Sequence, residues 1–168
     1  MSAPLTKTQL PLEAILDLFG KQTYLGNSFI LPMTGKSLAD TSETSLAVIR
    51  NPSTSGKSIF LVSRRFSTDL NPVLVKVYVN SVLNVPGSTT TPLNLRSGAT
   101  TASISQSYLG ASFTNNGTLL WTTAATLAVP ALETLLYVID PGTNALLTAT
   151  QVGVGTSVVQ SQLAWYEI

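Results

Sequence analysis

The clearest pattern in the chain is an alternation of valine with other residues over residues 73–80. The valines take the four odd positions, so they lie on one side of an extended chain, while Lys76 lies on the other. From residue 27 onward turn-forming residues recur about every ten residues, which is typical of a chain of short strands. The predicted strands are residues 27–32, 45–50, 58–66, 73–80, 91–95, 101–107, 118–123, 133–140, 145–150 and 157–167.

No helical periodicity separates any two of these strands, which argues against a parallel sheet with crossover helices. We therefore predict an all-β fold, an antiparallel β-sandwich or jelly roll, with a closed barrel as the remaining alternative. Asn115-Asn116-Gly117 predicts a hairpin. Asp140-Pro141-Gly142 predicts a β-turn with proline at its favoured second position.

One short helix is predicted near the N-terminus, with Pro11 as its first residue and Gly20 just after its end. Four apolar residues at helical spacing share one face of it. They are Leu12, Ile15, Leu16 and Phe19. Such a short helix is not stable alone, so this face packs on its own domain or on a partner. We predict an N-terminal arm and helix over residues 1–26, with these four residues binding a partner, and a β-sandwich domain over residues 27–168.

Charge is scarce: only 10% of the residues are charged, and the net charge is +1. Hydroxyls supply the polarity instead, since 19 Ser and 23 Thr are present. No Lys, Arg, Asp or Glu lies between Arg96 and Glu133, or between Asp140 and Glu167. Because the cores of interfaces are depleted in charge, this pattern favours a surface covered by further copies of the chain or by a partner. The nearly balanced charge argues against direct nucleic-acid binding.

A membrane span is not expected, because the most apolar stretch, residues 119–139, contains Pro130 and Glu133. The N-terminus does not have the pattern of a secretory signal peptide either.

Catalytic chemistry has little support in the sequence. The chain has no Cys and no His, which excludes thiol and His-dependent mechanisms. The Gly-Lys-Ser triplets at residues 35–37 and 56–58 lack the first glycine of a phosphate-binding loop, and no helical pattern follows them. The sparse carboxylates are expected to be surface groups, with no calcium site or glycosidase pair among them. We predict no enzyme activity, cofactor or metal.

Exposed aromatic side chains would indicate a sugar- or peptide-binding surface. Trp121 lies in an apolar run and is expected in the core. Trp165 and Tyr166 are neighbours on the last predicted strand, so one is expected to face inward and the other outward.

The chain resembles the small β-rich structural proteins of tailed bacteriophages, namely head decoration (cement) proteins and head-fibre or tail accessory proteins. The likeness covers roughly residues 44–168 and is a pattern of strands and turns. The segments that carry it are residues 44–53 (TSLAVIRNPS), 56–61 (GKSIFL), 115–120 (NNGTLL), 140–142 (DPG) with Leu146 and Leu147, and 164–168 (AWYEI).

The resemblance implies a jelly-roll-like homotrimer on the capsid surface of a virion, made in the host cytoplasm. Its implied function is capsid decoration, by binding the major capsid protein and stabilising the head. The alternative is a receptor- or glycan-binding fibre or tail accessory protein of the same fold. No functional residue is carried over from the resemblance.

Overall fold

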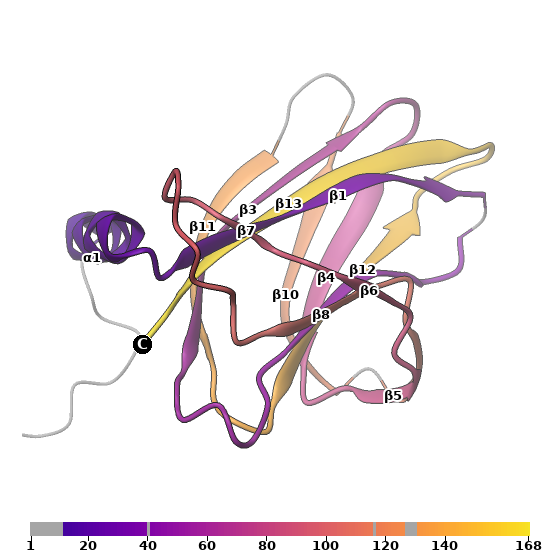
Figure 1. Ribbon diagram of the computed structural model, residues 1–168. Coiled ribbons are helices and arrows are strands. Elements are labelled where there is room, and N and C mark those ends of the chain that lie inside the picture. Colours follow the sequence, from indigo (N-terminus) through magenta and orange to yellow (C-terminus); the bar gives the residue numbers. More distant parts are fainter. Residues whose placement is uncertain (1–11, 40, 116, 127–130) are drawn as a thin grey trace, which may run out of the picture.

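The computed structural model describes residues 12–39, 41–115, 117–126 and 131–168. In these residues two antiparallel β-sheets pack face to face, with one helix at one end of them (Figure 1). Sheet 1 has the order β11 (Ala131–Ile139), β3 (Ile59–Thr68), β13 (Ser157–Glu167), β1 (Ser28–Leu38) and β7 (Leu93–Asn94). Sheet 2 has the order β10 (Thr118–Ala125), β4 (Val73–Val79), β12 (Asn144–Gln151), β2 (Thr44–Arg50), β8 (Gln106–Leu109) and β6 (Ser88–Thr90).

The strand pairing is that of a long two-stranded antiparallel ribbon. The chain reverses direction at residues 80–117, so that the strands before this segment pair with the strands after it. β4 pairs with β10, β3 with β11, β2 with β12, and β1 with β13, all antiparallel. Along each arm of the ribbon, successive strands alternate between the two sheets. This arrangement is a jelly roll, so the predicted antiparallel sandwich class is confirmed.

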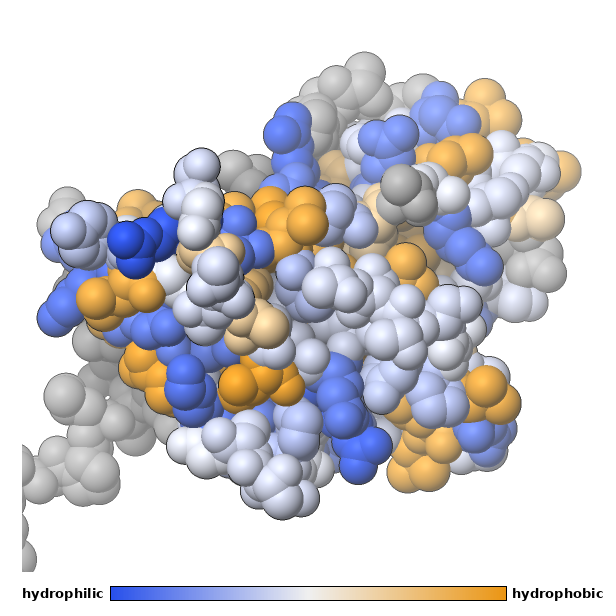
Figure 2. All heavy atoms as spheres, in the orientation of Figure 1, coloured by the Kyte–Doolittle hydropathy of each residue, from blue (hydrophilic) through white to orange (hydrophobic). Residues whose placement is uncertain are grey.

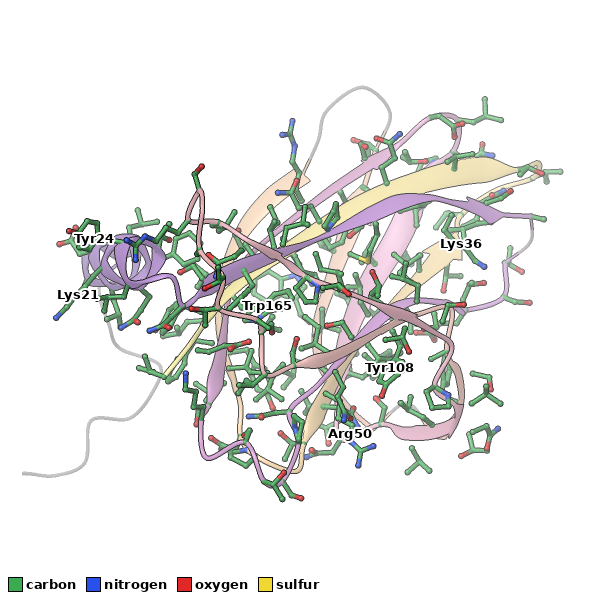
Figure 3. The ribbon with its side chains drawn as sticks, viewed as in Figure 1. Lys21, Tyr24, Lys36, Arg50, Tyr108 and Trp165 are labelled. Carbon is green, nitrogen blue, oxygen red and sulfur yellow. The ribbon has the colours of Figure 1, made fainter. Side chains whose placement is uncertain are left out.

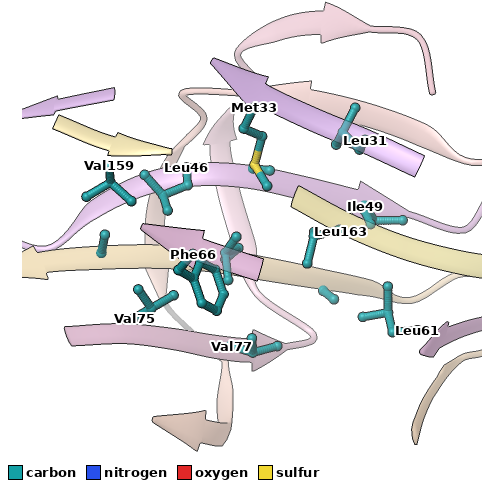
Figure 4. Close-up of a cluster of buried hydrophobic side chains, with 14 of the residues drawn as sticks. Leu31, Met33, Leu46, Ile49, Leu61, Phe66, Val75, Val77, Val159 and Leu163 are labelled. Carbon is teal, nitrogen blue, oxygen red and sulfur yellow. The ribbon is translucent and has the colours of Figure 1, made fainter. Parts of the chain in front are cut away.

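The hydrophobic core fills the space between the sheets (Figure 4). Val75 and Val77 of β4 point into it, as the valine alternation predicts. They meet Phe66 of β3 and Leu163 of β13 from the opposite sheet. Burying one such side chain contributes roughly 1.5–3 kcal/mol, so the core is the main source of stability.

Helix α1 (Leu12–Leu25) is longer than predicted. Gly20 does not end it, since the helix continues to Leu25. The residue after the helix is Gly26, whose φ of 79° is the left-handed conformation that glycine adopts most readily. Gly26 N donates to Thr23 O at 3.0 Å and Asn27 N donates to Gln22 O at 2.8 Å, which completes a Schellman motif.

The helix covers part of the outer face of sheet 1. Leu18 and Phe19 pack against Val62 and Tyr166, and the Phe60 ring stacks on Tyr166 with 4.8 Å between ring centroids. Tyr166 is therefore buried on the outer face by the helix, while Trp165 is buried between the sheets. The predicted alternation is confirmed, since the two side chains lie on opposite sides of sheet 1. The outward residue, Tyr166, is nevertheless not exposed, because helix α1 covers it.

Residues 80–117 form an insertion that extends both sheets at the same side. β7 lies beside β1 in sheet 1, and β8 and β6 lie beside β2 in sheet 2. A separate pair, β5 (Val82–Val85) and β9 (Ser112–Asn115), brings Leu83 and Phe113 over the outer face of sheet 2, against Tyr78 and Leu146. The insertion thus covers one side of the sandwich and part of one face.

Two turn predictions had different outcomes. The predicted turn at Asp140 is confirmed, since Thr143 N donates to Asp140 O at 3.1 Å and Gly142 has a φ of 85°. The predicted hairpin at residues 115–117 is wrong: β9 and β10, which flank it, pair with β5 and β4 and not with each other. Asn116 itself lies outside the described residues. The short strands β5, β6 and β9 were not predicted, because runs of three or four residues carry too little alternation to detect.

Glu167 fastens the insertion to the end of β13. Its carboxylate accepts hydrogen bonds from Ser103 Oγ, from Ile104 N at 3.1 Å and from Trp165 Nε1 at 3.1 Å. Only 2% of the residue is exposed, so the expectation of a surface carboxylate is wrong for Glu167. Three donors replace the water that a buried carboxylate would otherwise need.

We expect Glu167→Gln to lower the free energy of unfolding by about 2–3 kcal/mol, because the amide brings a donor against donors that the carboxylate accepts. Urea unfolding followed by tryptophan fluorescence measures this change. The control is Glu43→Gln, at a partly exposed ion pair, for which we expect a loss below about 1 kcal/mol. Equal losses in the two variants would show that the Glu167 contacts are unimportant.

Candidate interaction surfaces

The outer side of α1 exposes large side chains (Figure 3). Leu16 is 51% exposed, and Tyr24 is 77% exposed with the Arg96 guanidinium 5.7 Å from its ring centroid. Gly20 lies between Leu16 and Tyr24 at four-residue spacing, which leaves a shallow apolar stripe along the helix. Hydrophobic side chains interrupt the hydrophilic surface here and over β5 (Figure 2).

Two of the four predicted partner-binding residues, Leu16 and Phe19, point in different directions. Phe19 turns toward sheet 1, with 6.4 Å between its ring centroid and that of Tyr166, whereas Leu16 faces solvent. The side chains of Leu12 and Ile15 lie outside the described part of the structure. Which partner the helix binds stays a prediction, and of the two residues whose side chains are described, Leu16 is the one exposed to solvent.

A second apolar surface lies on β10, the end strand of sheet 2. Leu119 is 50% exposed, and Leu120 and Trp121 are each 40% exposed. The expectation that Trp121 lies in the core is wrong, because an end strand has a neighbour on one side only. The guanidinium carbon of Arg64, a fully buried residue, lies 4.8 Å from the Trp121 ring centroid and 5.2 Å from that of Phe66.

A third apolar surface is formed by two loops, residues 69–72 and 152–156. Leu70, Val152 and Val154 are exposed there, and Val154 is 97% exposed. The loop is nevertheless held in place, because buried Gln151 donates to Gly155 O at 2.7 Å and Asn71 donates to Val154 O at 3.1 Å. The alternation of valine and glycine over residues 152–155 was the sequence signal for this tip, and it was not recognised.

Polar side chains contribute to the lining of a hollow of about 540 Å³ on the outer face of sheet 1. Gln162 on β13 lies opposite Arg65 on β3, and Gln160 lies opposite Ser67. No hydrogen bond within the described ranges uses the side chains of Arg65, Gln160 or Gln162. The hollow can therefore bind a polar group, but its lining residues include no carboxylate that could act as a general acid or base.

The two Gly-Lys-Ser triplets do not form phosphate-binding loops. Gly35 lies within β1, where an added Cβ would come 2.4 Å from Val158 Cγ1. Gly56 lies in the loop between β2 and β3, and no helix follows either triplet, as predicted. Within the described ranges no three His, Cys, Asp or Glu side chains could hold a metal ion. Nor does any helix there have the length and apolar character to cross a membrane.

An ion pair lies on the outer face of sheet 2. Lys76 Nζ is 3.2 Å from Glu43 Oε2, and Thr148 Oγ1 donates to Glu43 Oε1. Burial alone would raise the pKa of Glu43, but hydrogen bonds from Thr148, Tyr78 and Lys76 outweigh it and hold the pKa below the ordinary 4.5. Partial burial likewise opposes the charge on Lys76, but Glu43 outweighs it and raises the pKa of Lys76 above 10.5.

Folding lowers the pKa of Glu43, so its contribution to stability is present above pH 4.5 and is lost as the pH falls through the folded pKa. We expect Glu43→Gln to remove this part of the acid destabilisation. The pair is partly exposed, so the difference should stay below about 1 kcal/mol. Urea unfolding of both proteins between about pH 6 and about pH 3 measures it. Parallel pH profiles for the two proteins would contradict this assignment.

Neither the family models nor the curated protein sequences give a match to this chain. Among solved structures, the chain is similar to a protein chain in the structure of infectious bursal disease virus, Gx strain. The similarity has a TM-score of 0.33 and 10% sequence identity, and it covers 82% of this chain. The chain spans about a third of the length of that protein, since 31% of it is covered. A likeness at this level does not define a fold family, so the jelly-roll assignment rests on the strand order of the chain itself.

Proposed function

We propose that this chain is a non-enzymatic structural protein of a virus particle, specifically a decoration protein that binds the head of a tailed phage as a homotrimer. The observation that carries the proposal is the exposure of large apolar side chains on a surface with very little charge. The jelly-roll strand order supports it, because this fold is frequent among viral capsid domains. Fold alone does not specify function, so the surfaces carry the argument.

The outer stripe of α1 is the proposed head-binding surface. The inner side of the helix is already occupied by the contact of Phe19 with Tyr166, so the helix is held on sheet 1 with Leu16 and Tyr24 facing outward. A helix docked in this way presents its apolar side chains without having to fold on binding, which lowers the entropic cost of association.

Leu16→Asp should weaken binding to phage heads that lack this protein by at least about tenfold, because a carboxylate would be desolvated without a partner. Co-sedimentation of the purified protein with such heads measures binding. The control is Val85→Asp, at another exposed apolar residue. Phe19→Asp is less informative, because it also removes the contact with Tyr166. Unchanged binding of Leu16→Asp would exclude the helix as the head-binding surface.

Salt should have little effect on this binding. The chain has only 17 charged residues of nearly balanced sign, and apolar contacts are not weakened by simple salt. Raising NaCl from about 0.1 to about 1 M shortens the Debye length from roughly 10 to roughly 3 Å, yet we expect less than a tenfold change in affinity. A steep fall in affinity would instead indicate an electrostatic contact, for example through exposed Arg65.

A receptor- or glycan-binding role is the second candidate, and the polar hollow on sheet 1 favours it. Arg65, Gln160 and Gln162 offer free donors and acceptors that match sugar hydroxyls or a sugar carboxylate. A glycan array with the wild-type chain and a Gln160→Ala, Gln162→Ala double variant tests this role. Binding that the double variant loses would favour it over head decoration.

A further inference from the structure

The edges of the sheets differ between the two sides of the sandwich. On one side the insertion adds β7 beside β1, and β8 and β6 beside β2. On the other side sheet 2 ends at β10, and no strand in the described part of the chain pairs with its outer edge. Proteins protect such edges with Lys, Pro or bulges, and β10 has only a bulge between Leu119 and Trp121.

Three neighbouring side chains of this edge are large and apolar, and one of them is held in place. Leu119, Leu120 and Trp121 are all 40–50% exposed. The indole ring of Trp121 lies over the buried guanidinium of Arg64, at 4.8 Å, so it is ordered before any partner arrives. An ordered, partly exposed tryptophan next to two exposed leucines has the composition of an interface centre.

Charge is absent from the whole region of the chain that contains β10, since residues 97–132 include no Lys, Arg, Asp or Glu. Near a symmetry axis a residue meets its own equivalents, and identical charges there would repel one another. Neutral apolar and hydroxyl side chains can meet themselves without this cost. Two or more copies of the β10 edge can therefore meet without repulsion between like charges.

We propose that the β10 edge packs against the same edge of other copies of this chain, around a three-fold axis. The symmetry rests on the proposed function, whereas the self-contact is argued from β10 alone. The three apolar residues expose on the order of 250 Å² together, about a third of the roughly 800 Å² per partner in a stable interface. Exposed Thr118, Thr122 and Ala124 on the same strand extend the contact.

Sedimentation velocity at micromolar concentration tests the contact. We expect the wild type to sediment as a species of three times 17.7 kDa and Leu120→Lys to sediment as a monomer. The matched control is Leu93→Lys, which changes an exposed leucine on β7, at the opposite side of the sandwich. It should remain a trimer. A monomeric wild type, or a Leu120→Lys variant that stays associated, would overturn the proposal.

A mixing experiment tests whether residue 120 meets its own equivalents. Leu120→Lys and Leu120→Glu should each be monomeric, and an equimolar mixture should associate again, because two of the three contacts in a mixed trimer then join opposite charges. Far-UV circular dichroism and thermal unfolding check that both variants are folded. No association in the mixture would show that a different surface faces β10. Head binding by Leu16→Asp is measured separately, so a failure of the proposed function can be distinguished from a failure of this contact.

Discussion

The last strand, β13, is the element on which the rest of the structure depends. It lies between β1 and β3 in sheet 1, so the end of the chain pairs with its beginning. Three consecutive residues near its end then have three different tasks: Trp165 fills the core, Tyr166 supports the helix, and Glu167 holds the insertion. The core, the helix and the insertion are joined at one point, and each depends on the register of this strand.

Most charged residues in the described part of the chain are exposed, but four others help to hold internal structure. Arg64 lies buried against two aromatic rings, Glu167 is enclosed by hydrogen-bond donors, and Glu43 pairs with Lys76 on a sheet face. Hydrogen bonds satisfy Glu167, and an opposite charge satisfies Glu43, whereas the contacts of Arg64 with the two rings are cation–π contacts. The outer surface carries scattered charges among many hydroxyl and apolar groups, a composition closer to that of protein interfaces than to that of a site that steers a charged ligand.

The exposed apolar side chains belong to elements that are themselves well supported. The helix that presents Leu16 is fastened through Phe19, Trp121 is stacked on Arg64, and the loop that presents Val154 is braced by Gln151. Support of this kind distinguishes a preorganised contact from a loosely packed surface, because little further ordering is needed on binding. Because these contacts hold the exposed apolar side chains in place, the chain can have several apolar surfaces in addition to its core.

The sequence by itself determined the class of fold and many of its strands. Alternation at residues 73–80 and the turn at Asp140 are local signals, because backbone conformation and the side of a strand are set by neighbouring residues. Only the tertiary structure decided the strand order and the surroundings of individual side chains. Tyr166 is buried by a helix more than 140 positions away, Glu167 by an insertion more than 60 positions away, and Trp121 is exposed because its strand ends a sheet. Burial depends on what packs against a residue, and in a jelly roll that neighbour is usually distant in sequence.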